Sequence, residues 1–459
     1  MKNLHNISIF GTSSDAGKST LTFVIAKIIQ DLGYTVAPFK AQNVSNNAIA
    51  CQDETEIAVA QYFQAEVLGL EPCYQMNPIL LKSGQKNSAS LIVNGRAVAN
   101  KDVLEYYRDL DGLKPAVKAS FEYLNSKFNC IVAEGAGSPV ELNLMDKDLS
   151  NIYIATEFKT KIILVADIEK GGVFASIWGV YNLLPKELQQ NVIGVIVNKF
   201  RGDLSLFDKG IEIIEKEFNI PVLGVLPYIP FNLGFEDSQS LFNYQQKSNK
   251  NAKRVAVIAY PTMSNYNDFE PLIADENIAL EFVQHNISLE GFDQIILAGS
   301  KLVIKDLEWL KETGLFEQIQ KSNKEILGIC GGYQMMFQYI HDPEAIETQK
   351  PMKIKGLGLI DDDIIFYKEK IIKRDRYNVF GKQINGFEIH HGISKKYPLF
   401  YEKENIKGTF IHGLFNDKMF ESYKREAINN FVEEMKKRLN IKRIINSLDN
   451  KNFKKSYKK

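Results

Sequence analysis

The sequence has few cysteines and no long apolar run. Its cysteines are Cys51, Cys73, Cys130 and Cys330, and they show neither the paired spacing of a metal site nor the density of a disulfide-rich secreted protein. No apolar run approaches the roughly 20 residues that cross a bilayer. No signal peptide precedes the first predicted strand. We therefore expect a cytoplasmic protein with reduced thiols and no membrane partner.

The chain also lacks a net charge. Its 56 basic and 56 acidic residues balance, which gives no reason to expect a nucleic acid or an anionic membrane as a partner. The exception is the segment 436–459, which has ten Lys or Arg residues and one acid, Asp449. We predict that this basic tail is a solvated or frayed helical end; an interaction tail is the alternative.

With 459 residues, of which 45% are apolar, the chain is long enough for two or three cores. Apolar runs that alternate with helical patterns predict strands at 7–10, 35–39, 130–133, 162–165, 192–197 and 222–225. The alternation restarts at 254–258 and continues at 294–297, 325–329 and 408–411. The predicted fold class is α/β, with two domains that each have a mainly parallel sheet covered by helices.

A polar stretch without an apolar face separates the two halves. We predict that residues 236–253 are a linker. The predicted domains then span 1–235 and 254–435, and the basic tail follows at 436–459.

A loop that fits phosphate follows the first predicted strand. Residues 11–20 read GTSSDAGKST, and such loops aim backbone N–H groups, a helix N-terminus and a lysine at a phosphate. The two glycines are one residue further apart than in the standard GxxxxGK[ST] pattern, so this is a variant; a tight turn before a helix is the alternative. We predict Lys18 on the β- and γ-phosphates and Ser19 on Mg²⁺. The predicted nucleotide-binding residues here are Gly11, Thr12, Asp15, Ala16, Gly17, Lys18 and Ser19.

Further candidates lie near predicted strand ends. A phosphate loop needs an acid nearby to hold the metal or its waters, and Glu134 is the predicted carboxylate. Lys40 is the predicted additional cation, and Asp53 is a further metal candidate at a predicted helix start. Asn198 is a candidate for adenine contact. For each, an ordinary loop or surface residue is the alternative.

A second signature is a cysteine elbow. Residues 326–335 read ILGICGGYQM, so Cys330 follows a predicted strand and precedes a helix. The glycines allow a sharp turn, while the Gly331 N–H and the helix N-terminus stabilise thiolate and oxyanion. Gly299 is the predicted second oxyanion donor, with a plain turn as the alternative.

A nucleophilic cysteine needs a base, and the chain has only six histidines. His412 follows a predicted strand and precedes a glycine, a loop-edge position suited to reaching Cys330. We predict that His412 is the general base. His390 and His391 are its competitors.

Together, these and other motifs resemble the cobyric acid synthase family along nearly the whole chain. They include PFKAQN at 38–43, MNPILLK at 76–82, EGAGSP at 134–139, ADIEKGGVFAS at 166–176, MSNYNDF at 263–269 and GTFIHGLF at 408–415. The chain departs from the usual family pattern around 53–61, at Thr262 and at 300–302.

The resemblance implies an ATP-dependent amide-ligase domain similar to dethiobiotin synthetase, joined to a class I glutamine amidotransferase domain. The implied reaction is amidation of the b, d, e and g carboxylates of adenosylcobyrinic acid a,c-diamide, a corrinoid, through acyl phosphates. ATP and Mg²⁺ are the implied cofactors, and glutamine is the ammonia donor. Many class I amidotransferases have a His-x-Glu pattern, but in this chain Gly413 and Leu414 follow His412. The cobyric acid synthase family is similar in lacking the pattern. The resemblance therefore implies a dyad of Cys330 and His412, unless another carboxylate orients His412.

Other functions share parts of these signatures. The related a,c-diamide synthase and a cell-wall lipid amidotransferase share the elbow. A partitioning-type ATPase shares the variant loop, but nothing in such a protein requires Cys330 with His412. Glutaminase activity therefore separates the amidotransferases from the ATPase.

Overall fold

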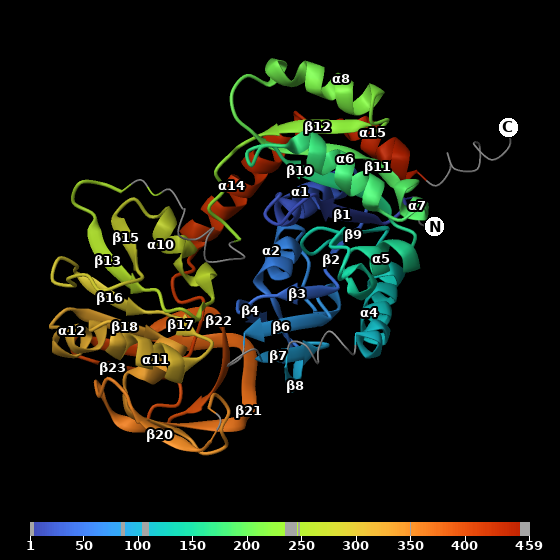
Figure 1. Cartoon of the computed structure of the whole chain (residues 1–459). Coiled ribbons are helices and arrows are strands. Elements are labelled where there is room, and N and C mark those ends of the chain that lie inside the picture. Colours follow the sequence, from blue (N-terminus) through green and yellow to red (C-terminus); the bar gives the residue numbers. More distant parts are fainter. Residues whose placement is uncertain are drawn as a thin grey trace.

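The computed structural model describes residues 4–83, 88–102, 110–234, 246, 248–348 and 350–449. Two α/β bodies lie side by side, each built around a six-stranded sheet (Figure 1). We call them the N-terminal body and the C-terminal body, after the halves of the chain that supply their sheets. The predicted α/β class with two mainly parallel sheets is confirmed.

The sheet of the N-terminal body has the strand order β12-β11-β10-β1-β9-β2, and every pair is parallel. Alternate side chains point to opposite faces. Ile163 therefore packs with α1 (Lys18–Asp31) on one face, and Leu164 packs with α6 (Val173–Leu183) on the other. The strands are β1 (Ile7–Gly11), β2 (Val36–Phe39), β9 (Cys130–Glu134), β10 (Lys161–Asp167), β11 (Val192–Phe200) and β12 (Val222–Pro227).

The sheet of the C-terminal body has the order β15-β13-β16-β18-β24-β23, with the edge strand β23 antiparallel to β24. Parallel strands end at the same edge, so β16 and β18 deliver Gly299 and Cys330 to one place. The strands are β13 (Lys253–Ile258), β15 (Ile278–Val283), β16 (Gln294–Leu297), β18 (Glu325–Ile329), β23 (Phe400–Lys403) and β24 (Ile406–Thr409).

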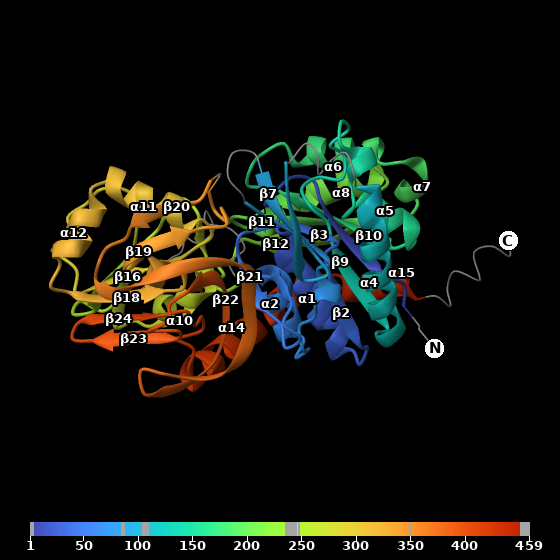
Figure 2. The same ribbon diagram turned by 90° about the horizontal axis from the view of Figure 1, so that it is seen from below.

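Smaller sheets lie where the two bodies meet. In the C-terminal body, β21 (Ile360–Val379) and β22 (Lys382–Ile393) form a long hairpin beside β19 (Phe337–Asp342) and β20 (Met352–Lys355). In the N-terminal body, β3 (Gln42–Val44), β6 (Ile79–Ser83), β7 (Ser88–Val93) and β8 (Arg96–Asp102) form a second sheet. The pair β4 (Ala48–Ala50) and β5 (Glu56–Ala58) precedes α2 (Val59–Val67), and β4 contacts β22. Figure 2 shows the hairpin of β21 and β22 on the side of the C-terminal body that faces α2.

The C-terminal helices return to the N-terminal body. Helix α14 (Lys418–Lys436) packs on α1, where Phe431 lies 6.0 Å from Phe23 between ring centroids. Helix α15 (Ile441–Leu448) buries Ile444 and Leu448 in the same core, as expected for apolar residues four apart on one helix face. The prediction of a frayed end is therefore wrong for α15. Residues 450–459 lie outside the described residues.

Most of the predicted linker, residues 236–253, also lies outside the described residues, so the domain boundaries stay a prediction. Among the helices that the structure describes, none is long and apolar enough to cross a membrane.

Candidate functional site

The predicted phosphate loop joins β1 to α1. Gly17 caps α1 with a φ of 97°, in the left-handed region that favours glycine. A Cβ at Gly17 would lie 2.2 Å from Nδ2 of Asn198, and this Nδ2 donates to the Ala16 carbonyl at 2.9 Å. Asn198 thus supports the loop from the end of β11, and its contact with adenine stays a prediction.

Lysine side chains surround this loop. Lys18 Nζ donates to the Ser13 carbonyl at 3.1 Å, and Lys199 Nζ donates to the Asp15 carbonyl at 2.6 Å. The Thr12 N–H donates to the Val165 carbonyl at 2.8 Å, which ties the loop to β10. A cavity of about 530 Å³ opens here, lined by Asp15, Gly17, Lys18, Ser19, Lys40 and Glu134 among others. A Cβ at Gly11 would lie 2.8 Å from Lys18 Nζ, so Gly11 leaves room for that lysine.

Glu134, the last residue of β9, is the centre of a buried polar cluster. Its Oε1 accepts hydrogen bonds from Ser19 Oγ at 2.8 Å and from Lys40 Nζ at 2.7 Å. Gln64 Nε2 donates to Oε2 at 2.6 Å. The structure thus brings three predicted residues together at the mouth of the phosphate cavity.

Asp53 is not part of this cluster. It lies exposed in the turn between β4 and β5, and its Oδ1 accepts a hydrogen bond from Thr55 Oγ1 at 2.5 Å. The sequence suggested a helix start here, whereas the structure has a hairpin. The hydrogen bond of Asp53 that the structure describes is within its own turn, so the assignment of Asp53 to the metal ion stays a prediction.

The cysteine elbow has the predicted form. Cys330 stands between β18 and α13 (Gly331–Met335) with φ 48° and ψ −105°, a strained conformation for a residue with a side chain. A Cβ at Gly331 would lie 2.5 Å from the Ser300 nitrogen, and one at Gly332 would lie 2.1 Å from the Leu297 carbonyl oxygen. The glycines therefore let the elbow press against the end of β16.

His412 lies next to Cys330 and is fully buried. Its Nδ1 lies 2.6 Å from Oδ2 of Asp268, and the Gly413 N–H donates to Oδ1 of the same carboxylate at 2.9 Å. Burial lowers the pKa of His412, but the Asp268 carboxylate and the neighbouring Cys330 outweigh it and raise the pKa to about 10. The implied dyad is therefore corrected to a set of three, with Asp268 as the orienting carboxylate.

The competing histidines have other partners. His390 Nδ1 lies 2.7 Å from the Gly392 carbonyl oxygen, and its Nε2 lies 3.1 Å from Oε2 of Glu388. His391 Nδ1 lies 2.9 Å from the Tyr367 carbonyl oxygen. Burial, followed by the charge of Lys370, lowers the pKa of His391 to about 4. Both histidines line the Cys330 cavity, but Asp268 supports only His412 as the base.

The predicted oxyanion glycines also meet at the elbow. Gly299 lies in β17 (Gly299–Ser300), which pairs with β14 (Met263–Ser264). A Cβ at Gly299 would lie 3.3 Å from Cε1 of His412. The next residue, Ser300, also lies here, since a Cβ at Gly331 would lie 2.5 Å from the Ser300 nitrogen.

Both bodies line the small cavity at Cys330, which measures about 60 Å³. Asn46, Ala48 and Lys82 come from the N-terminal body, while Lys301, Lys370 and Glu347 come from the C-terminal body. Next to it, the buried carboxylate of Glu56 accepts hydrogen bonds from Lys82 and, at 2.6 Å, from Lys370. Burial raises the pKa of Glu56, but the two lysines outweigh it and lower the pKa to about 2. An ion group thus joins the bodies beside the thiol.

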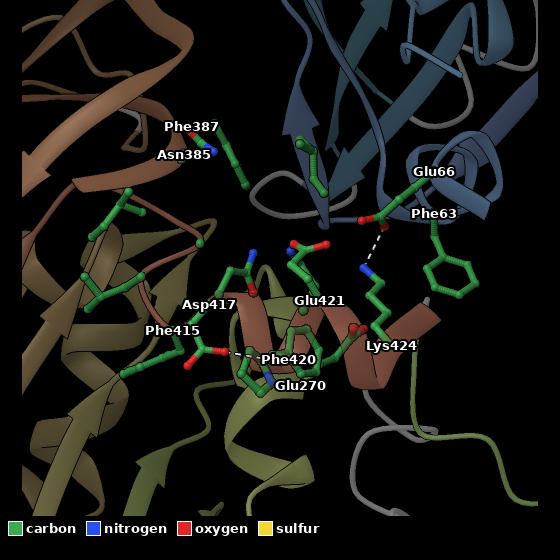
Figure 3. A pocket seen from close by; sticks show the side chains of 18 of the residues that line it. Phe63, Glu66, Glu270, Asn385, Phe387, Phe415, Asp417, Phe420, Glu421 and Lys424 are labelled. Atoms are coloured by element: carbon green, nitrogen blue, oxygen red, sulfur yellow. Dashed lines mark hydrogen bonds and ion pairs between the residues drawn. The ribbon is translucent and has the colours of Figure 1, made fainter. Parts of the chain in front are cut away.

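A larger cavity of about 1170 Å³ also lies between the bodies (Figure 3). Phe63 and Glu66 of α2 face Asn385 and Phe387 of β22 across it, and Lys424 of α14 pairs with Glu66 at 2.6 Å. Phe63 and Gly234 line both this cavity and the phosphate cavity. The two spaces are therefore neighbours separated by α2.

Comparison with known proteins agrees with this two-part site. Residues 7–233 match the model of the CobQ/CobB/MinD/ParA nucleotide binding domain. Residues 254–420 match that of the CobB/CobQ-like glutamine amidotransferase domain. A cobyric acid synthase of Acinetobacter baylyi (strain ATCC 33305 / BD413 / ADP1) is 63% identical over 97% of this chain and 99% of its own length.

The chain belongs to the cobyric acid synthase family. A cobyric acid synthase of Clostridium tetani (strain Massachusetts / E88) is 37% identical over 95% of this chain and 92% of its own length. The probable cobyric acid synthase of Picrophilus torridus is 38% identical over 91% of both chains. Family membership, predicted from the motifs, is confirmed, and the partitioning ATPase and the other amidotransferases are not favoured.

We expect Asp268→Asn to lower kcat for glutamine hydrolysis about 10²-fold, because the neutral amide no longer stabilises the charged imidazole. Ammonia-dependent synthesis should be unchanged. Steady-state glutaminase assays measure this, with the exposed Asp293→Asn as a control. Full glutaminase activity in Asp268→Asn would exclude an orienting role.

We expect Glu56→Gln to lower the free energy of unfolding by about 3 kcal/mol, because it leaves the ammonium groups of the buried Lys82 and the half-buried Lys370 without their counter-charge. Urea unfolding followed by fluorescence measures the change. Glu54→Gln, at an exposed position two residues away, should leave the transition nearly unchanged. Equal midpoints for the two variants would contradict a stabilising ion group.

Proposed function

We propose that this protein amidates the b, d, e and g carboxylates of adenosylcobyrinic acid a,c-diamide, using ATP, Mg²⁺ and glutamine. One observation carries the proposal. A phosphate cradle around Lys18 and a Cys330, His412 and Asp268 set occur in one chain, and its full-length relatives are named cobyric acid synthases.

The N-terminal body activates the acceptor. A carboxylate is a poor electrophile until it is phosphorylated. In this proposal Lys18 and Lys40 offset the negative charge that moves between the γ-phosphate and the carboxylate. The oxygens of Ser19 and Glu134, 2.8 Å apart, suit a hard cation such as Mg²⁺. When bound, this ion neutralises phosphate charge.

The C-terminal body releases ammonia. The thiol of Cys330 gives its proton to Nε2 of His412, and the thiolate attacks the side-chain amide carbon of glutamine. The N–H groups of Gly331 and of the segment 299–300 donate to the oxyanion, and Asp268 stabilises the imidazolium. His412 then passes the proton to the leaving ammonia, and water hydrolyses the thioester to glutamate.

In this proposal the ammonia passes from the Cys330 cavity to the phosphate cavity. Ammonium, the protonated form, is not a nucleophile. Transfer away from bulk water therefore keeps the ammonia unprotonated and reactive. Gln42, Asn43 and Val44 line the phosphate cavity, and Asn46 and Ala48 line the Cys330 cavity. The segment 42–48 therefore borders both sites and is the route that we propose.

The large cavity is our candidate for the corrinoid. Its aromatic side chains, including Phe387 and Tyr62, offer apolar faces to a macrocycle, and Arg374 and Lys382 offer positive charge to its carboxylates. Because Phe63 and Gly234 are shared with the phosphate cavity, a bulky acceptor there can present a carboxylate toward Lys18.

Incubation with a panel of carboxylated corrinoids, ATP and glutamine tests the proposal, with product masses as the readout. We expect four successive OH-to-NH₂ replacements on the a,c-diamide. Reaction only with the precursor whose a and c carboxylates are not yet amidated would indicate an a,c-diamide synthase. Absence of any amide product would refute the proposed function.

A further inference from the structure

Three lysines line the small cavity at the thiol, and they differ in their partners. Lys82 and Lys370 both donate to the carboxylate of Glu56. Lys301 lies in the turn between β17 and α11 (Val303–Glu312). Its ammonium group forms no hydrogen bond or ion pair among the residues that the structure describes. Burial, followed by the charge of Lys370, lowers the pKa of this ammonium group. The turn therefore brings to the cavity a cation that no described carboxylate contacts.

A carboxylate lines the same cavity. Oε2 of Glu347 accepts a hydrogen bond from the Ile304 N–H at 2.9 Å, which holds the side chain at the start of α11. Burial raises the pKa of Glu347 to about 7, although the Ile304 N–H and the charge of Lys301 act in the opposite direction. Among the described residues, no ion pair joins Glu347 to Lys301. Two opposite charges thus line one cavity without contacting each other.

A zwitterion fits these two charges. A buried charge without a close partner is unfavourable, so the cavity favours a ligand that brings both an anion and a cation. An α-amino acid carries its carboxylate and ammonium groups on one carbon. Its carboxylate suits Lys301, and its ammonium group suits Glu347. A ligand with only one of these groups would leave the other side chain without a partner.

Both side chains are close to the nucleophile. Ser300, which precedes Lys301, has its backbone nitrogen against Gly331, which follows Cys330. In glutamine, two methylene groups separate the amide carbon from the α-carbon. An amide carbon that is placed for attack by the thiolate therefore keeps the α-carbon in the cavity that Lys301 and Glu347 line.

We propose that Lys301 binds the α-carboxylate of glutamine and that Glu347 binds its α-ammonium group. The pair selects free glutamine over amides that lack these charges, such as glutamine side chains within a polypeptide. The amides of the corrinoid product lack them too, so Cys330 does not hydrolyse what the other body has made. This inference rests on the proposed function for glutamine as the nitrogen donor, but its contacts are independent of the acceptor.

Two analogues of glutamine test the assignment in a glutaminase assay. 4-Aminobutanamide lacks the α-carboxylate, and glutaramate lacks the α-amino group. We expect the unaltered protein to hydrolyse each analogue with kcat/KM about 100-fold below that for glutamine, because one charged side chain stays unpaired. Released ammonia measures the rate.

Variants assign each charge to its side chain. Lys301→Met should lower kcat/KM for glutamine about 100-fold, mainly through KM, and should not lower it further for 4-aminobutanamide. Glu347→Gln keeps an oxygen for the Ile304 N–H. It should lower kcat/KM for glutamine to a similar extent and leave that for glutaramate unchanged. Lys305→Met, at an exposed position of α11, is the control and should retain full discrimination among the three substrates.

Equal losses for all three substrates in Lys301→Met would indicate a structural effect and would overturn the assignment. Unchanged kcat/KM for glutamine in that variant would overturn it as well. If the variants do not fold, the unaltered protein still decides, because equal kcat/KM for glutamine and both analogues would contradict the proposal. Failure of the proposed function would appear differently, as a protein that hydrolyses glutamine but forms no corrinoid amide.

Discussion

Replacing Cys330 with serine should abolish glutamine-dependent amidation, by at least about 10³-fold, while amidation with ammonium chloride continues near the original rate. The reason is the separation of the two sites. Cys330 stands at the end of β18 in the C-terminal body, whereas Lys18 and Glu134 belong to the N-terminal body. Loss of the thiol therefore removes the ammonia source and leaves carboxylate activation intact.

Product formation measured with each nitrogen donor in turn checks this result. Cys73→Ser is the matched control, because Cys73 is a free thiol away from the elbow, and it should retain both activities. An equal loss with glutamine and with ammonia in Cys330→Ser would show that the sites are not separate.

Replacing Lys18 with alanine should suppress amidation with either donor by about 10²- to 10³-fold. Phosphorylation of the carboxylate precedes attack by ammonia, so supplying ammonia cannot rescue this variant. The ammonium group of Lys18 lies inside the phosphate loop, 3.1 Å from the Ser13 carbonyl oxygen. Its removal takes away positive charge where the γ-phosphate is transferred.

Release of ADP and formation of amide are the measurements for Lys18→Ala. Lys27→Ala, on the same helix but paired with Asp31 at 2.7 Å, should behave like the unaltered protein. Basal glutamine hydrolysis should persist in Lys18→Ala. Undiminished ammonia-dependent turnover would remove Lys18 from the mechanism.

Features encoded by neighbouring residues were predictable from the sequence. The six strands of the N-terminal sheet are apolar on both faces, so their runs are visible without a structure. The loop at 11–20 and the elbow at Cys330 are likewise continuous patterns of glycine and reactive side chains, and the structure has both in the expected strand-to-helix context.

Features that depend on distant residues were missed. Asp268 lies 144 residues before His412, and only its place within the motif MSNYNDF at 263–269 pointed to it. Asn265, in the same motif, donates its backbone N–H to Oδ1 of Asn47 in the other body. The hairpin of β21 and β22 is rich in polar residues, and only at the junction of the bodies do its apolar residues Ile372, Phe387 and Ile389 pack against the N-terminal body.

The prediction of a solvated basic tail also failed because it did not take contacts with distant residues into account. Its lysines and arginines suggested a solvated tail, but Ile444 and Leu448 face the core of the N-terminal body. Around Asp53, an acidic cluster suggested a helix start, whereas the structure has a hairpin turn between β4 and β5. Charge composition alone did not reveal that one face of α15 packs against the N-terminal body.

The central claim is that ATP activates a carboxylate as an acyl phosphate in one body while the other supplies the nitrogen. Its most direct test uses the corrinoid with ¹⁸O-labelled carboxylates, together with ATP and amide-¹⁵N glutamine. We predict one ¹⁸O atom in inorganic phosphate and one ¹⁵N atom in the product for each amide formed. Inorganic phosphate free of ¹⁸O, alongside normal amide formation, would contradict the account.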